Sequence, residues 1–451
     1  MASPRYTLIF AALLVLVAPA SMRAQTPATP QISEALSAEF GKLRELTEAQ
    51  SYATALVSID RLLGVAPADS YDRILLSQVK AQILLSQGKY ADSISPFEEV
   101  LRLAERPGYL SAAAQTDTLF LLAQLYQQQA SESKDLAVQR KMLASAATYL
   151  NRWQARTPNP TPAGQLFAAS LYYQQSTLVP EKIDSTLLAS SRAAAEAGLP
   201  LQLKPPASLY VLILATLQQS EKHLESTDIL ELLVEQNPAN SSYWQQLSAT
   251  YLALAGAAKN EREADRYNLR ALLTLERAQA RGFLVSPKEN FNVVALYLGL
   301  RQFDPAIALL EKGLSDGTLE NTRRNWELLA NSYQQSQRET EAIAALEKAV
   351  VRLPEDGQLE FSLAQLLYGR TRVADARRHL GFAVKKGHLD KPGQTRLFLA
   401  YTAFELQDYA DAAAKAGEAA NFDDVKKDDL VRLKKAIDDA LRTRVSATSK
   451  S

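Results

Sequence analysis

The sequence contains no cysteine and only three histidines. The lack of cysteine excludes a disulfide framework, a thiolate zinc site, a cysteine nucleophile and an acylated lipoprotein cysteine. His223, His379 and His388 are not at ligand spacing from one another, which favours solvated or packing roles over a metal site. We therefore expect neither a metal ion nor another cofactor.

The sequence also lacks an excess of charge of either sign, because 50 basic residues balance 50 acidic ones. A neutral chain has no net field that would draw it to nucleic acid or to an anionic membrane, so we expect no nucleic-acid partner. Motifs of common catalytic sites, such as a glycine-rich phosphate loop, G-x-S-x-G or H-E-x-x-H, are missing as well. These absences favour a protein that is not an enzyme.

Glycine is scarce, at 17 of 451 residues, and strong helix formers such as alanine, leucine and glutamine abound, which predicts an all-α fold. A chain of this length exceeds one compact core, yet no long linker rich in proline, glycine or serine divides it. An array of helical repeats satisfies both conditions.

Long hydrophobic runs are absent except near the N-terminus, where Arg5 precedes the apolar run Leu8–Val17 and small residues follow. This pattern predicts a signal peptide at residues 1–24, because the run is shorter than the roughly 20 residues that a membrane-spanning helix needs. An uncleaved leader that tethers the chain to the inner membrane is the alternative. Residues 25–34 are expected to form a flexible lead-in.

Small residues recur with a fixed period in the C-terminal half. Ala306, Ala342, Ala376 and Ala412 are 36, 34 and 36 residues apart. Two further ladders keep the same steps, namely Gly313, Ala349, Ala383 and Ala419, and Val294, Ala330, Ala364 and Ala400. Antiparallel helices approach closely only where a small side chain lies at the crossing, so each ladder predicts one repeated helix crossing.

The stretch 325–354 shows one repeat most clearly, and it resembles a tetratricopeptide repeat. The matching residues are Trp326, Leu329, Ala330, Tyr333, Ala342, Leu346, Ala349 and Pro354. The resemblance implies a right-handed tetratricopeptide-type α-solenoid, and we count about ten helix pairs along the chain.

The pattern predicts an order of segments along the chain. A more degenerate N-terminal array spans 35–205, and a C-terminal array spans 206–422. Residues 423–445 form an amphipathic stripe that predicts a helix capping the apolar end of the solenoid. Residues 446–451 are expected to form a disordered tail.

Two units are longer than the rest. The distance between successive small positions is 23 residues from Ala123 to Ala146 and from Ser248 to Ala271, against 12 from Ala330 to Ala342. Eleven extra residues are close to three helical turns, which predicts elongated helix pairs. A flexible loop around residues 131–135 is the alternative for the first unit.

In tetratricopeptide folds the first helix of each pair lines a concave binding face. We therefore expect aromatic and amide side chains of these helices to contact a protein partner, and ordinary packing between helices is the alternative. The candidates are Phe291, Asn292, Asn331, Phe361, Gln365, Tyr368, Tyr401 and Phe404. One variant of the fold clamps a partner's terminal carboxylate with Lys and Asn, but Glu327 occupies the position of the cation, so we do not expect that role here.

Three strings are more specific: Ala308–Leu314, Asn325–Ser332 and Lys391–Gln394. With them, the region from Phe283 to Phe422 resembles the periplasmic tetratricopeptide proteins that accompany the TonB, ExbB and ExbD energy-transduction system. The resemblance implies a periplasmic scaffold that docks on this inner-membrane complex and supports uptake of iron chelates or similar nutrients through the outer membrane. It covers about a third of the chain.

Two other functions remain open from the sequence. The first is an adaptor for envelope assembly or polysaccharide export, in which tetratricopeptide solenoids also serve. The second, of another class, is an enzyme acting on the cell wall through a site without a recognised motif. The sequence does not predict the oligomeric state.

Overall fold

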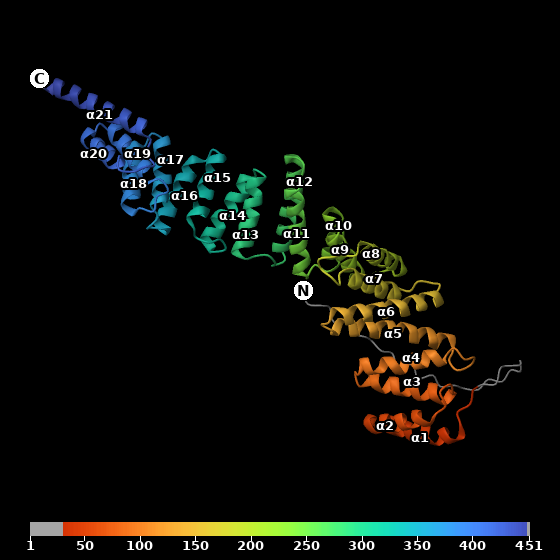
Figure 1. The fold of residues 1–451 in the computed structure, drawn as a ribbon. Coiled ribbons are helices and arrows are strands. Elements are labelled where there is room, and N and C mark those ends of the chain that lie inside the picture. The colour runs from red at the N-terminus through yellow and green to blue at the C-terminus, as the bar shows by residue number, and fades with distance from the viewer. Residues whose placement is uncertain (1–29, 449–451) are drawn as a thin grey trace. The chain divides into compact units, whose positions relative to one another are not determined.

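The computed structural model describes residues 30–448, and all regular structure within this range is helical (Figure 1). The predicted signal peptide, residues 25–29 of the predicted lead-in and the last three residues lie outside the described residues. The predicted all-α fold of about ten helix pairs with a C-terminal helix is confirmed, because within residues 30–448 twenty α-helices form ten successive pairs and one more follows.

The chain divides into two compact units, Met1–Thr216 and Leu217–Ser451, and the division falls inside α9. The first unit contains α1 (Glu34–Glu48), α2 (Tyr52–Val65), α3 (Tyr71–Ser86), α4 (Tyr90–Leu103), α5 (Ala112–Glu132), α6 (Leu136–Arg156), α7 (Pro162–Ser176), α8 (Ser185–Gly198), the short 3-10 helix η1 (Leu199–Leu201) and most of α9 (Ala207–Gln219). The repeat pattern had placed the division slightly earlier, after residue 205.

The second unit continues with α10 (His223–Gln236), α11 (Ser241–Gly256), α12 (Glu261–Gln279), α13 (Pro287–Gly299), α14 (Phe303–Asp316), α15 (Arg323–Gln335), α16 (Glu339–Arg352), α17 (Gly357–Gly369), α18 (Val373–Lys386), α19 (Pro392–Glu405), α20 (Tyr409–Ala419) and α21 (Lys427–Thr448). Figure 1 shows α13 to α20 succeeding one another in chain order, as in a solenoid. No helix within residues 30–448 combines the length and apolar character needed to span a bilayer.

The small-residue ladders mark helix crossings, as predicted. Ala306, Ala342, Ala376 and Ala412 are fully buried. The turns inside the pairs add a ladder that composition does not reveal, since Arg301, Gln337, Thr371 and Gln407 all have a positive φ between 57° and 61°. These four residues repeat the steps of 36, 34 and 36. In each of the last four pairs, the turn between the two helices therefore contains one residue in the left-handed conformation, although none of the four is glycine.

The longer units are elongated helix pairs rather than loops. Helices α5 and α6 have 21 residues each, and α11 and α12 have 16 and 19. The alternative of a flexible loop around 131–135 is wrong, because α5 continues to Glu132 and α6 begins at Leu136. Buried Ala130 and Leu143 extend the packing toward this turn, which stabilises the added helical residues.

The C-terminal helix α21 packs through Leu433 and Ile437 on the core of α19 and α20. It begins later than predicted, because residues 423–426 form a turn in which the Asp424 carboxylate accepts the backbone N–H groups of Gly393 and Gln394 at 3.0 and 3.1 Å. It also continues to Thr448, into part of the predicted tail. The string Lys391–Gln394 thus has a structural role as the start of α19, held by the turn that leads to α21.

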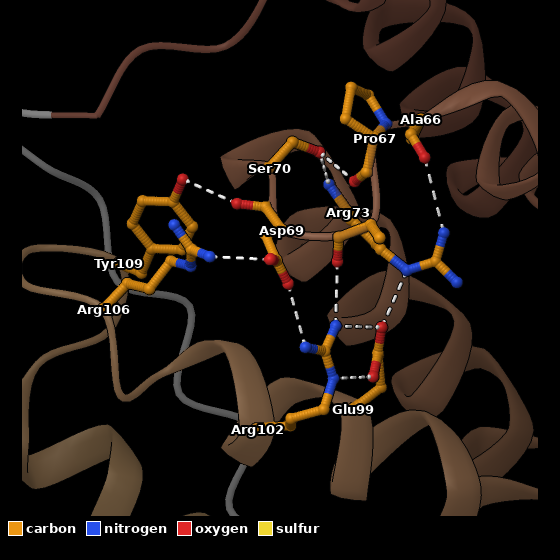
Figure 2. Close-up of polar contacts among 10 residues, drawn as sticks. Ala66, Pro67, Asp69, Ser70, Arg73, Glu99, Arg102, Arg106 and Tyr109 are labelled. Carbon is orange, nitrogen blue, oxygen red and sulfur yellow. Dashed lines mark hydrogen bonds and ion pairs between the residues drawn. The ribbon is translucent and has the colours of Figure 1, made fainter.

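In the first unit, a network of ion pairs ties the start of α3 to the end of α4 (Figure 2). Arg102 donates to Glu99 at 2.7 Å and to Asp69 at 2.9 Å, and Arg106 donates to the other oxygen of Asp69 at 2.7 Å. Arg73 also donates to Glu99 at 2.7 Å and reaches back to the carbonyl oxygen of Leu63 at the end of α2. Each charged side chain of the network has an oppositely charged partner within it. The network is therefore a structural junction between repeats.

Candidate protein-binding face

The eight candidate residues all lie on first helices of the last four pairs. Phe291 and Asn292 lie on α13, Asn331 on α15, and the other five on α17 and α19. We call the partly open sides of these four helices, on which the candidates lie, the first-helix face. It belongs entirely to the second unit.

Side-chain contacts join each first helix to the next. The guanidinium of Arg324, on α15, lies 5.0 Å from the ring centre of Phe291 on α13. The Ser362 hydroxyl, on α17, donates to the Glu327 carboxylate on α15 at 3.3 Å. These two contacts link α13, α15 and α17 side by side, because each one joins residues on the first helices of successive repeats.

An aromatic cluster links α17 to α19. Phe361 and Tyr368 both contact the ring of Phe398 edge-on, with ring centres 6.3 and 4.9 Å apart. The Tyr368 hydroxyl donates to Glu405 at 2.6 Å, and this carboxylate together with partial burial raises the pKa of Tyr368. All three rings are half-buried, so they pack against the core and still offer apolar surface.

The candidates differ in how they are placed. Asn292, Asn331 and Gln365 are exposed, which leaves their amide groups accessible to a peptide backbone. Tyr401 and Phe404 pack partly on the separate core of α19 to α21, and Phe404 contacts Tyr409 with ring centres 5.5 Å apart. The structure therefore groups Phe361 with Tyr368, whereas Tyr401 and Phe404 form part of another cluster.

Sequence reasoning missed Phe398 and dismissed Glu327. Phe398 lies two residues before the small position Ala400, and only the tertiary contacts show that its ring faces α17. Glu327 is half-buried on the same face as exposed Asn331, one helical turn away. Burial raises the pKa of the Glu327 carboxyl, and the hydrogen bond from Ser362 only partly opposes this effect.

Arg323 closes the loop end of α15 and α17. Its guanidinium donates to Asp356, the residue that caps α17, at 2.6 Å and to the carbonyl oxygen of His388 at 3.2 Å. A weaker contact of 3.4 Å reaches Asp390. This cation is therefore committed to the linkers between pairs.

Two recesses of about 580 and about 490 Å³ lie elsewhere in the second unit. The first is lined by α10 and α12 over Trp244, whose ring is covered by the guanidinium groups of Arg277 and Arg281 at 5.0 and 5.1 Å. The second lies beside exposed Phe382, over α18 and α20. Neither of these two recesses includes a candidate residue.

Comparison with known families decides what kind of repeat this is. Residues 324–350, which comprise most of α15 and α16, match the tetratricopeptide repeat family. This chain carries a tetratricopeptide repeat. In the part of the chain that the structure describes, no group of three or more histidine, aspartate or glutamate residues could hold a metal ion.

Solved structures of tetratricopeptide proteins resemble parts of the chain. They include TTC0263, a thermophilic protein of Thermus thermophilus, with 21% identity over 45% of this chain and all of that one, at a TM-score of 0.24. YrrB, described as having an unusual peptide-binding site, is 13% identical over 46% of this chain and 97% of its own, at a TM-score of 0.33. MamA AMB-1 is 18% identical over 42% and 96%, at a TM-score of 0.31. No curated protein matches the chain.

Proposed function

We propose that the protein is a non-enzymatic interaction scaffold whose first-helix face binds an extended segment of another protein. The observation that carries this proposal is the row of half-buried aromatic rings and exposed amides on α13, α15 and α17. Aromatic rings supply apolar contact area at a low cost in side-chain entropy, and amides hydrogen-bond to a peptide backbone.

The finer proposal is an accessory protein of a TonB-type energy-transduction system in a bacterial periplasm. Its supports are the exported leader pattern at residues 1–24 and the resemblance of the region from Phe283 to Phe422. The partner is then a component of the TonB, ExbB and ExbD complex, and the assisted process is uptake of iron chelates or similar nutrients. An adaptor for envelope assembly or polysaccharide export is the alternative.

Site-specific crosslinking in cells tests both the binding role of the first-helix face and the TonB-type identity of the partner. A photoreactive phenylalanine analogue replaces Gln365 on the first-helix face, and a matched control replaces exposed Lys348 on α16. We expect a crosslinked protein at position 365 and none, or a different one, at position 348. Identification by mass spectrometry as a TonB-system component supports the finer proposal.

Other outcomes distinguish failure of the TonB-type proposal from failure of the binding role of this face. Crosslinking at 365 to an assembly or export protein favours the adaptor, and equal crosslinking at both positions contradicts a binding role of this face. Fractionation of the cells, with the intact mass of the exported protein, tests the location and the cleavage of the leader. A chain retained in the cytoplasm contradicts the periplasmic proposal.

A further inference from the structure

On the first-helix face, one carboxylate lies in a row of otherwise apolar side chains. Phe291, Glu327 and Phe361 are half-buried on α13, α15 and α17 and are 36 and 34 residues apart. The equivalent residue of α19 is Leu397, which is buried in the core of α19 to α21. Residues at equivalent positions of successive repeats form a line across the array. Glu327 therefore lies between two phenylalanines, at the position where the carboxylate-binding variant of the fold has a cation.

We infer that this row binds a protein segment that carries a lysine or arginine flanked by apolar side chains, with Glu327 as the partner of the cation. The inference rests on the proposed function, since it requires that the first-helix face binds protein. It goes further by assigning the charge of the ligand and the residue that reads it.

The Glu327 carboxylate has capacity for a further donor. Its one hydrogen bond within the described residues comes from the Ser362 hydroxyl at 3.3 Å, and none of the ion pairs in that range involves it. A carboxylate has about four acceptor positions, so one long hydrogen bond leaves most of them for water or a ligand. A half-buried carboxylate gains more from a cationic partner than an exposed one, because less solvent screens the pair.

The nearest cation on the same helix does not satisfy Glu327. Arg323 lies one turn earlier, but its guanidinium is held by Asp356 at 2.6 Å and by Asp390 at 3.4 Å. Burial is the largest cause that raises the pKa of Glu327 above its ordinary value. The charge of Arg323 lowers this pKa, whereas the nearby Asp356 and Asp390 raise it. Within the described residues, Arg323 therefore acts on the Glu327 carboxylate only from a distance, and its ion pairs are with Asp356 and Asp390.

The flanking rings suit the stem of a basic side chain. Phe291 already carries the guanidinium of Arg324 over its ring, which shows that a cation and its alkyl stem can lie on this row. On the other side, Phe361 is half-buried and fixed edge-on to Phe398. Exposed Asn331 and Gln365 lie one turn further along α15 and α17, where their amides can hold the peptide backbone.

A library of random heptapeptides displayed on phage is the probe, selected on the full chain and on three variants. Glu327→Gln removes the charge and keeps the shape, and Glu327→Lys reverses the charge. Glu347→Gln, at an exposed position of α16, is the matched control. Circular dichroism checks that each variant keeps its helices.

We expect lysine and arginine to be enriched among peptides selected by the parent chain and by Glu347→Gln. A synthetic peptide from that set should bind Glu327→Gln about tenfold more weakly in fluorescence anisotropy, and Glu327→Lys should select acidic peptides instead. Affinity should also rise with pH through the elevated pKa of Glu327, because the carboxyl must lose its proton to pair with the cation.

Two results would overturn the inference. Only the second of them would also contradict the proposed function. If selected peptides bind and Phe361→Ser weakens them, but Glu327→Gln does not, the face binds protein and the assigned charge is wrong. If no peptide is selected, or if the selected peptides respond to neither Phe361→Ser nor Glu327→Gln, the proposed binding role of the face fails together with the inference.

Discussion

At the scale of single residues, the distance between neighbouring helices is set by positions where no side chain fits. Gly357 begins α17, and a Cβ atom placed on it would lie 2.1 Å from the carbonyl oxygen of Gly387 and 2.7 Å from that of Ala383. Both obstacles are backbone atoms of the end of α18, so they cannot move aside as a flexible side chain would. This close approach explains a glycine at the start of a helix.

We predict that Gly357→Ala lowers the free energy of unfolding by about 2 kcal/mol, because α17 and α18 must separate. Gly381→Ala is the control, since Gly381 lies inside α18 and its added Cβ meets no atom within 4 Å. The control should stabilise the chain by about 0.5–1 kcal/mol through helix propensity. Urea unfolding followed by circular dichroism measures both, and equal effects would contradict the steric argument.

A second residue-scale feature is the buried cluster of Glu360, His379 and Lys386 between α17 and α18. Glu360 is 4% exposed and contacts Nδ1 of His379 and Nζ of Lys386, each at 2.6 Å. Burial by itself would raise the pKa of Glu360, but these two partners outweigh it and hold the pKa below its usual range. His379 thus has a definite partner, which adjacent sequence does not indicate.

We predict that Lys386→Met lowers the free energy of unfolding by about 3 kcal/mol at neutral pH, since it leaves a buried carboxylate with one partner. Lys385→Met, at the exposed neighbouring position, should change it by less than about 0.5 kcal/mol. Because the pKa of Glu360 is depressed, its contribution exists above the ordinary value of 4.5 and is lost as pH falls below it. The difference between Lys386→Met and the parent chain should therefore shrink below pH 4.5, and a constant difference would exclude the ionic origin.

At the scale of helices, ion pairs and capping contacts join one repeat to the next. The network of Figure 2 connects α2, α3 and α4 through Arg73, Glu99 and Arg102. Hydrogen bonds from Arg102 and Arg73 outweigh partial burial and lower the pKa of Glu99 to about 2. Such a network contributes more than an isolated surface pair because each arginine has two partners.

We predict that Glu99→Gln lowers the free energy of unfolding by roughly 1–2 kcal/mol at pH 7, a value discounted for the exposure of Arg102. The lowered pKa means that the stabilisation is present above pH 4.5 and disappears as pH falls toward 2. Parent and variant stabilities should then converge in acid. Glu105→Gln, at an exposed position after α4, is the control and should have no measurable effect at either pH.

The C-terminal helix α21 covers the apolar end of the array with two buried side chains. Ile437 and Leu433 are almost fully buried against α19 and α20, whereas Val431 on the same helix is 64% exposed. We predict that Ile437→Asp detaches α21 and costs about 3 kcal/mol, because it places a charge in an apolar interface. Hydrogen exchange should increase in α19 to α21 and change little in α15, and Val431→Asp should leave the pattern of the parent chain. Uniform loss of protection would contradict a local cap.

At the scale of the whole molecule, a repeat array distributes stability unevenly, because each pair contacts only its neighbours. The core around α15 to α18 is larger than the core of α1 to α3 at the start of the described chain. We predict slowest amide exchange in α15 to α18 and fast exchange in α1 and α2, measured by mass spectrometry of peptic peptides. A single exchange rate for all helices would show global cooperativity instead.

Several residues in the strings that resemble the TonB-associated family have structural roles within this chain. Asn325–Ser332 contains Trp326, Leu329 and Ala330, which are core residues of α15. Lys391–Gln394 supplies the start of α19, with Gly393 against Asp424 and Phe422. The partner must therefore be identified from crosslinking on the first-helix face.

The sequence by itself determined the periodic part of this protein. The ladders of small residues predicted the helix pairs and their crossings, and the longer spacing from Ala123 to Ala146 predicted the long helices α5 and α6. These features follow from the 3.6-residue period of a helix and from the space that a side chain needs, both of which are local properties.

Only the tertiary structure decided which side chains of different repeats meet. The contact of Phe398 with Tyr368, the capping of α19 by Asp424 and the burial of Glu327 beside Ser362 each join residues about 30 positions apart or more. No local pattern encodes such meetings, because they depend on how each pair is rotated onto the next. That rotation places a half-buried carboxylate in the aromatic row of the first-helix face.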